Sequence, residues 1–268
     1  MTDRAIWVPD GVDIAVPSPA RMYDYLLGGG HNFAVDREMI DKIVARVPTV
    51  GQMALDNRAF LRRAVLALVD AGVRQFLDIG SGIPTAGNVH EIAQRAAPEA
   101  RVVYVDHDPV AVAHSEHVLQ GNDRAAVIQA DMRSPTAILE HPKTQRLLDF
   151  DAPIGLLMVT IFHYVAESDS PLDLMACYRD PLAQGSYLVL SHDTADLNPA
   201  AMAAVVELVK NSTSFYPRTR TEIAELFGGF ELLDPGLVPA AEWRSRLADG
   251  DGGKPGGDVV FAGVGIKR

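Results

Sequence analysis

The chain has only one cysteine, no stripe of basic residues and no long apolar run. Each of these features excludes a class of protein or of site. Cys177 is the only cysteine among 268 residues, which excludes a disulfide within the chain and a cysteine-based zinc site. The formal net charge is -11, and Lys and Arg form no stripe. Because a protein that binds duplexes needs such a stripe to displace counterions from phosphates, we expect no nucleic-acid partner.

The sequence also lacks the segments that direct or anchor a protein to a membrane. No apolar run approaches the ~20 residues that span a bilayer. The N-terminal run MTDRAIWVPDGVD has no basic start followed by an apolar core, so it does not resemble a secretory signal. We therefore expect a cytoplasmic protein without a membrane partner. Its expected state is a monomer or a homodimer.

Hydrophobic patterns predict an irregular lead-in over residues 1–19, then helices, then an alternation of strands and helices. From residue 75 onward, short apolar runs alternate with helical segments, which predicts a parallel sheet with helices on both faces. The helices expected before the sheet cover residues 20–27, 35–46 and 56–71. The expected strands cover residues 75–79, 101–105, 126–129, 154–159 and 186–191, and the helices after them 85–96, 109–120, 135–139, 171–179 and 199–210.

The C-terminal part ends differently. Thr219 and Glu222 fit a capping box, which predicts a helix that ends at Gly228. Residues 230–233 and 259–266 follow as two strand-like runs, and the loop between them has only a short helical stretch near Trp243. Because no helix long enough for a parallel crossover separates these runs, we expect an antiparallel pair. The expected organisation is a helical extension or lid over residues 1–72 and an α/β unit over residues 73–268.

Two strand ends that carry acids give the main functional signal. The runs FLDIGSG at 76–82 and YVDHD at 104–108 each read as a buried strand that ends in an acid. Ligands of open parallel sheets bind beyond the carboxyl ends of the strands, so Asp78 and Asp106 should border one crevice. Asp106 could accept both hydroxyls of a ribose. The alternative is a helix N-cap, a position that suits Asp108 better because it directly precedes a proline.

The turn after the first strand distinguishes between nucleoside ligands. Gly80 and Gly82 allow the backbone to turn tightly and to approach a ligand, although a plain strand–helix turn would also use them. Thr85 stands where a dinucleotide site has its third glycine. Asp78 can accept a hydrogen bond from an ammonium group, whereas a carboxylate there would repel the diphosphate of NAD.

Residues after the later strands are candidates for contacts with a base or with a second substrate. Asp131 could accept from the exocyclic amine of adenine and Met132 could cover a base face, or they could simply form a polar strand end. His163 and His192 follow the fourth and fifth strands, and a neutral histidine can act as a general base. Each could instead be a packed histidine. Tyr164, Tyr216 and Arg218 could line the pocket of that second substrate.

This set of motifs resembles class I S-adenosylmethionine-dependent methyltransferases, and more narrowly an actinobacterial S-adenosyl methyltransferase family. The likeness covers nearly the whole chain. It is carried by PSPARMYDYLLGGGHNFAVD at 17–36, NRAFLRRAV at 57–65, FLDIGSGIPTAGNVHE at 76–91, YVDHDPVAVAH at 104–114 and RTRTEIAELFGGFELLDPGLV at 218–238. The resemblance implies a Rossmann-like sheet of seven strands, mostly parallel with an antiparallel last strand. It departs from the broad superfamily at Ile83, Pro84 and Thr85, which replace a third glycine.

The resemblance also implies S-adenosyl-L-methionine as the cofactor. The cofactor contacts that it implies are Asp78, Gly80, Gly82, Asp106, Asp131 and Met132. We add Ser81 and His107, which are their neighbours in the sequence. The glycine-rich run YDYLLGGGHNF could close over the cofactor as a lid. Tyr23, Tyr25, Gly30, His31 and Asn32 would then touch the methionine end of the cofactor or the acceptor. The alternative for this run is a helix C-cap followed by a linker.

The expected function is therefore methyl transfer from S-adenosylmethionine to a small-molecule acceptor that the sequence does not identify. One alternative is a non-catalytic regulator that binds S-adenosylmethionine or a nucleoside. A less favoured alternative is an NAD(P)-dependent oxidoreductase, and no tyrosine has the lysine four residues later that short-chain reductases use. We expect no metal, because His114 and His117, three apart on one helix, are better explained as solvated side chains.

Overall fold

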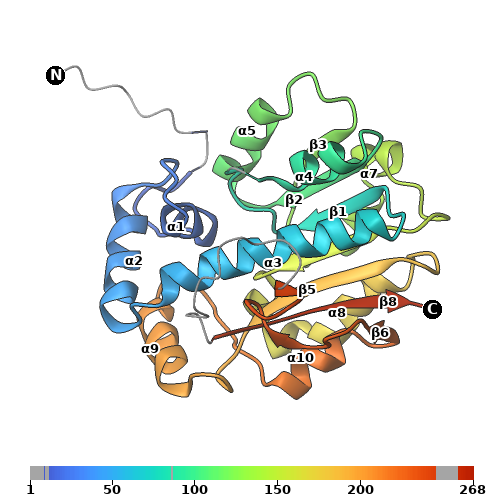
Figure 1. Cartoon of the computed structure of the whole chain (residues 1–268). Helices are drawn as coiled ribbons and strands as arrows, with labels where there is room; N and C mark the ends of the chain where they lie inside the picture. The colour runs from blue at the N-terminus through green and yellow to red at the C-terminus, as the bar shows by residue number, and fades with distance from the viewer. Residues whose placement is uncertain (1–8, 10–11, 86, 246–258) are drawn as a thin grey trace.

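Buried apolar strands form one twisted sheet at the centre of the molecule (Figure 1). The computed structural model describes residues 9, 12–85, 87–245 and 259–268. Within that part of the chain, the sheet has eight strands, seven of them in the order β3-β2-β1-β4-β5-β8-β6. The strands are β1 (Gln75–Ile79), β2 (Arg101–Asp106), β3 (Ala125–Gln129), β4 (Gly155–Val159), β5 (Tyr187–Asp193), β6 (Phe230–Leu232), β7 (Val238–Pro239) and β8 (Val260–Lys267).

Strand directions confirm the mostly parallel sheet with an antiparallel last strand. The pairs β1–β2, β2–β3, β1–β4 and β4–β5 are parallel. β8 is antiparallel to both β5 and β6, so the expected antiparallel pair at the C-terminal end is present. The short β7, which pairs with β8, was not expected. The Gly-rich loop expected between the last two runs lies largely outside the described residues.

The sheet separates two apolar cores because successive side chains of a strand point to opposite faces. Phe76 and Val102 belong to one core, whereas their neighbours Leu77 and Val103 belong to the other. Helices cover both faces. The α-helices of the described residues are α1 (Pro19–Leu26), α2 (Ala34–Arg46), α3 (Val50–Asp70), α4 (Val89–Ala96), α5 (Pro109–Val118), α6 (Pro135–Leu139), α7 (Pro142–Leu147), α8 (Pro171–Arg179), α9 (Pro199–Val209) and α10 (Arg220–Leu226).

Three helices differ from the sequence expectation. α3 begins at Val50 rather than at residue 56, because Val50 and Met53 are buried and outweigh the low helix propensity of Gly51. α4 begins at Val89 rather than at residue 85, since Asn88 and Glu91 form a capping box. α7 was not expected. The capping box of Thr219 and Glu222 is confirmed at the start of α10.

Trp243 lies in a turn two residues before Ser245, which is 3₁₀-helical, and it is fully buried with its ring edge-on to Phe60. Within the described part of the chain, no helix has both the length and the apolar content needed to cross a bilayer. The division into residues 1–72 and 73–268 stays a prediction.

Buried charges fix the N-terminal helices α1 and α2 to the edge of the sheet. Arg21 of α1 donates to Asp36 of α2 at 2.8 Å, and its second nitrogen lies 3.6 Å from Asp108, which follows β2. Ser18 donates to Asp108 through its hydroxyl and to Asp36 through its backbone N–H. Asp36 also accepts from the backbone N–H of Phe33. Because these groups are buried, each charged side chain would destabilise the fold without the partners that neutralise it.

Asp36→Ala tests this attachment. The change leaves the buried guanidinium of Arg21 without its nearest carboxylate, and removing one partner of a buried ion pair typically costs about 3–5 kcal/mol. We expect a loss of that order in the free energy of unfolding, measured with urea. Glu38→Ala, an exposed change on the same helix, should stay within about 0.5 kcal/mol of the unchanged protein. Equal losses in the two variants would contradict the attachment.

Candidate functional site

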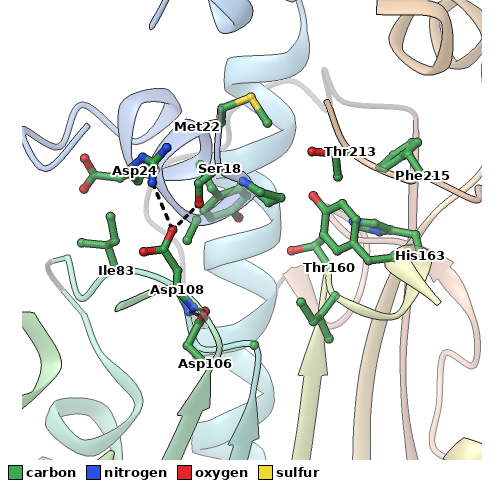
Figure 2. Close-up of a pocket in the computed structure, with 18 of the residues that line it drawn as sticks. Ser18, Met22, Asp24, Ile83, Asp106, Asp108, Thr160, His163, Thr213 and Phe215 are labelled. Atoms are coloured by element: carbon green, nitrogen blue, oxygen red, sulfur yellow. Dashed lines mark hydrogen bonds and ion pairs between the residues drawn. The ribbon is translucent and has the colours of Figure 1, made fainter. Parts of the chain in front are cut away.

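One cavity of about 580 Å³ lies between the carboxyl ends of the sheet strands and the helices α1, α2, α3 and α9. This volume falls within the range of small-molecule sites, about 300–1,000 Å³. Figure 2 shows two facing walls, with Asp106 and Asp108 on one side and Thr160, His163 and Phe215 on the other. The cavity therefore sits at the edge of the sheet where open parallel sheets bind their ligands.

The turn after β1 brings backbone to the cavity surface. Gly80 has φ +72°, and a Cβ placed there would lie 2.3 Å from Cγ1 of Ile161, so both its conformation and its space require glycine. Gly82 also has a positive φ, of +68°. The Oγ atom of Ser81 is buried and has no hydrogen-bond partner among the described residues. The turn thus offers a polar atom that a ligand could satisfy.

Asp106 is held rigidly at the end of β2. One carboxylate oxygen accepts from the backbone N–H of Gly82 at 2.7 Å, and the other accepts from that of Asp108 at 2.9 Å. Burial raises the pKa of Asp106, and these two backbone bonds oppose that rise. Asp108 accepts from the backbone N–H of Val110, so Asp108 rather than Asp106 caps α5, as expected.

Asp78 and Arg58 form the charged corner of the cavity. Burial raises the pKa of Asp78 to about 7; the charge of Arg58 opposes the rise and that of Asp106 adds to it. Arg58, on α3, lines the cavity and donates to the carbonyl of Gly87 at 3.2 Å. A carboxylate and a guanidinium at one corner can bind an ammonium and a carboxylate group. The sequence patterns did not single out Arg58, because its position beside Asp78 depends on how α3 packs on the sheet.

Asp131 and Met132 line the cavity beyond β3, and His107 lies at its rim. Asp131 forms a bidentate pair with Arg133, with distances of 2.5 Å to Nη2 and 3.0 Å to Nε. These bonds lower the pKa of Asp131. The sequence analysis missed Arg133, although it stands only two residues away.

The opposite wall combines a histidine–carboxylate pair with aromatic rings. His163 Nδ1 lies 2.7 Å from Asp193 Oδ2, and the two side chains are 3% and 9% exposed. The ring of His163 is 4.3 Å from that of Tyr164 and 4.7 Å from that of Phe215, measured between centroids. All four residues line the cavity. The carboxylate attracts a proton on Nδ1, although this atom makes no hydrogen bond of good geometry among the described residues; Nε2 is the nitrogen left to accept a proton.

A buried amide joins the wall of Thr160 and His163 to the N-terminal helices. Asn57 of α3 donates to the hydroxyls of Tyr23 and Thr160 at 3.0 and 3.2 Å. Its carbonyl oxygen accepts from the hydroxyl of Ser191 at 2.7 Å. Thr160 has φ +50°, an uncommon conformation for a residue with a side chain, and its N–H donates to Ser191. No local pattern could have revealed Asn57, because its partners are far away in the sequence.

Several residues predicted for the site do not line the cavity. These residues are Tyr25, Gly30, His31, Asn32, His192, Tyr216 and Arg218. The run after α1 wraps around Asp24, which accepts from the N–H of His31 and the amide of Asn32, each at 2.8 Å. A Cβ at Gly29 would overlap the carboxylate of Asp24. The residues of the run YDYLLGGGHNF that line the cavity are Tyr23, Asp24, Leu26 and Leu27, at its start.

His192 lies on the wrong face of its strand for a catalytic contact. β5 continues to Asp193, beyond the expected end at residue 191, so the alternation of side chains turns Asp193 to the cavity and His192 away from it. His192 Nε2 lies 3.1 Å from a guanidinium nitrogen of Arg218, and burial lowers the pKa of His192 well below its usual range. The prediction that His192 meets an acceptor does not agree with this position.

Tyr216 and Arg218 support the wall from behind. Arg218 is buried and donates to the carbonyls of Phe162 and Val165, on either side of His163 and Tyr164. Tyr216 is 38% exposed and donates its backbone N–H to the carbonyl of His163. Within the described residues, no group of three His, Cys, Asp or Glu side chains is placed to hold a metal ion.

The strand order, the glycine turn and the acids after β1 and β2 together define a Rossmann-like protein of the class I methyltransferase type. The chain belongs to the S-adenosyl methyltransferase family, which matches residues 5–268. No curated protein matches the chain.

Solved structures agree with this assignment. A protein from Thermobifida fusca YX, proposed to be a methyltransferase, is 39% identical with a TM-score of 0.91, over 98% of this chain and 100% of that one. A DUF574 family protein from Streptomyces avermitilis is 36% identical with a TM-score of 0.91, over 96% and 99%. The fold is shared with 1,6-didemethyltoxoflavin-N1-methyltransferase from Burkholderia thailandensis, solved with S-adenosylhomocysteine, at 17% identity and a TM-score of 0.50 over 98% of each chain.

The protein is thus an S-adenosylmethionine-dependent methyltransferase. The residues present fit that cofactor. The hydroxyl of Ser81 has no hydrogen-bond partner among the described residues, and Asp78 and Arg58 complement the two charges of an amino acid.

Asp78→Asn tests, in the ligand-free protein, whether the buried carboxylate of Asp78 destabilises the fold. The pKa of Asp78 is raised from 3.8 to about 7 in the folded protein, so its carboxyl favours folding below pH 3.8 and loses that contribution as the pH rises to about 7. We expect the variant to melt at a higher temperature than the unchanged protein, by a margin that grows from pH 4 to pH 7 and is constant above.

Thermal unfolding of the ligand-free proteins measures this margin. Asp70→Asn, an exposed change on α3, serves as the control and should show no such growth. A margin for Asp78→Asn that does not change with pH would contradict the account of this corner.

Proposed function

We propose that this methyltransferase acts on a small molecule, with the cofactor held at the acid-lined wall and His163 as the general base on the facing wall. The observation that supports this most is that a single cavity reaches both the Asp78–Asp106 corner and the His163–Asp193 pair. In this proposal one wall binds the cofactor and the other binds and deprotonates the acceptor.

The cofactor wall has a group for each part of S-adenosylmethionine. Asp106, whose carboxylate is oriented by two backbone N–H groups, is proposed to accept from the ribose hydroxyls. Asp78 is proposed to accept from the ammonium group and Arg58 to bind the carboxylate. Asp131 and Met132 are proposed to contact the adenine. When bound, the cofactor supplies a methyl group on a positively charged sulfur.

The facing wall deprotonates and orients the acceptor. Asp193 positions the ring of His163 and favours the proton on Nδ1, so Nε2 can take a proton from the acceptor. Asn57 and Thr160 hold the end of β4 against α3 and so fix the position of the facing wall. Holding the reacting groups close and in line is the main contribution that the protein makes to such a transfer.

A small acceptor agrees with the enclosure of the site. α1, α2 and α3 cover the cavity, and residues 1–72 are proposed to act as its lid. The net charge of -11 and the acids around the cavity disfavour a nucleic acid.

Transfer of tritium from methyl-labelled S-adenosylmethionine into fractionated extract of the host cell tests the proposal. We expect the label in the low-mass fraction only. Label in protein or nucleic acid, or no transfer from a protein that binds S-adenosylhomocysteine, would contradict it. The second outcome would favour the alternative of a regulator that binds the cofactor without catalysis.

Arg58→Gln tests the binding of the carboxylate. S-adenosylhomocysteine carries the amino-acid end, whereas 5′-methylthioadenosine lacks it. A charge-assisted bond contributes about 1.5–3 kcal/mol, so the variant should bind S-adenosylhomocysteine roughly 10–100-fold more weakly and 5′-methylthioadenosine unchanged, by calorimetry. Arg62→Gln, an exposed change on the same helix, should alter neither. Equal weakening for both ligands would rule out a specific role of Arg58 at the carboxylate.

His163→Gln tests the general base. A positioned base accelerates proton transfer by about 10²–10⁴-fold, so the rate of label transfer should fall by that factor while the affinity for S-adenosylhomocysteine stays constant. Asp193→Asn should reduce the same rate through the orientation of the ring. His117→Gln, an exposed histidine on α5, should leave the rate unchanged. A His163→Gln variant with full activity would exclude the base.

A further inference from the structure

The half of the cavity farthest from the acids is an apolar chamber. It is formed where α2 and α9 pack together beside the N-terminal end of α3 (Figure 1). Buried side chains from these helices line it, including Ile43, Val50, Met53, Leu61, Met202 and Val209. Apolar surface of this kind binds a ligand by removing apolar area from water. Methionines add adaptability, because their thioethers fill irregular gaps and make favourable contacts with aromatic rings.

The charged side chains around the cavity disfavour an anionic acceptor. Among the described residues that line it, the basic side chains other than histidine are Arg21, Arg58 and Arg133. Arg21 is paired with Asp36, Arg133 with Asp131, and Arg58 faces Asp78. None of the three belongs to α2 or α9.

Two carboxylates lie along the remaining path. Asp193 lines the cavity beside His163, and Asp24 also lines it, with its carboxylate packed against the chain from Gly29 to Asn32. An acceptor with a negative charge in the chamber would therefore meet repulsion from these carboxylates, with no cationic side chain of α2 or α9 beside it to compensate.

An aromatic wall joins the chamber to the base. Tyr164 and Phe215 flank His163, with 5.9 Å between their own ring centroids. Rings at such distances offer faces and edges to a planar ligand, and aromatic pairs contribute beyond the area they bury. A flat ring seated on this wall would bring a substituent to His163.

We propose that the acceptor is a neutral, planar aromatic compound with one hydroxyl group, its rings in the α2–α3–α9 chamber and its hydroxyl at His163. This assignment rests on the proposed function. The acceptor oxygen forms a bond to the methyl carbon as the carbon–sulfur bond breaks, and sulfur keeps the bonding pair as a neutral thioether. The hydroxyl proton moves to Nε2 of His163.

Binding of three probes to the full chain, saturated with S-adenosylhomocysteine, tests the assignment by calorimetry. 2-Naphthol is neutral, planar and hydroxylated; 2-naphthoate has the same rings with a negative charge; decahydro-2-naphthol keeps the hydroxyl but is not planar. We expect 2-naphthol to bind about tenfold or more tightly than either of the others. Equal affinity for 2-naphthoate would overturn the inference on charge, and equal affinity for decahydro-2-naphthol the inference on planarity.

Val205→Lys provides the matched variant, because Val205 of α9 lines the cavity and is only partly buried. The added cation should reverse the preference, with 2-naphthoate bound more tightly than 2-naphthol and S-adenosylhomocysteine bound as before. If the variant still binds S-adenosylhomocysteine and its preference among the probes is unchanged, the probes bind elsewhere. That result would contradict the proposal that the acceptor occupies the α2–α3–α9 chamber. Failure of the unchanged protein to bind S-adenosylhomocysteine would instead count against the proposed function.

Discussion

A chain of buried carboxylates ties the N-terminal helices to the sheet, and the site depends on it. Asp106 binds the glycine turn of β1 and the backbone of Asp108; Asp108 binds Ser18 and Arg21; and Arg21 binds Asp36. Because a buried charge without its partner is costly, these contacts fix how α1 and α2 sit over the strand ends. With the helices in that position, the acid corner and the apolar chamber form one cavity rather than two open surfaces.

Two acids at the ends of neighbouring strands are prepared for different tasks by their surroundings. Asp106 receives two backbone hydrogen bonds, which orient it and oppose the effect of its burial. Asp78 is buried with only the charge of Arg58 to oppose the cost, and its pKa is raised to about 7. A cation bound at Asp78, as proposed for the ammonium group of the cofactor, would relieve that cost and so add to the free energy of binding. On the opposite wall, the carboxylate of Asp193 lies against the ring of His163 and orients it.

The sequence was sufficient for the sheet and for the acid-lined turn, because both are local patterns. Buried strands that end in Asp78 and Asp106 are visible as runs, and the glycines stand where the backbone must bend. The site residues that the sequence patterns did not reveal depend on the exact extent of a strand or on partners far away in the sequence. Two extra residues in β5 place Asp193 rather than His192 at the cavity, since a strand alternates its faces. Arg58 and Asn57 acquire their partners only when α3 packs on the sheet. The run YDYLLGGGHNF was predicted to reach the ligand; its first residues, such as Tyr23, line the cavity, whereas the chain from Gly29 to Asn32 wraps around Asp24.

A crystal structure of the full chain grown with S-adenosylhomocysteine would test the central claim most directly. The account predicts that the ribose lies against Asp106, the amino-acid end between Asp78 and Arg58, and the sulfur toward His163, with the α2–α3–α9 chamber left open beside it. A ligand bound outside this cavity, or one whose sulfur points away from His163, would contradict the account.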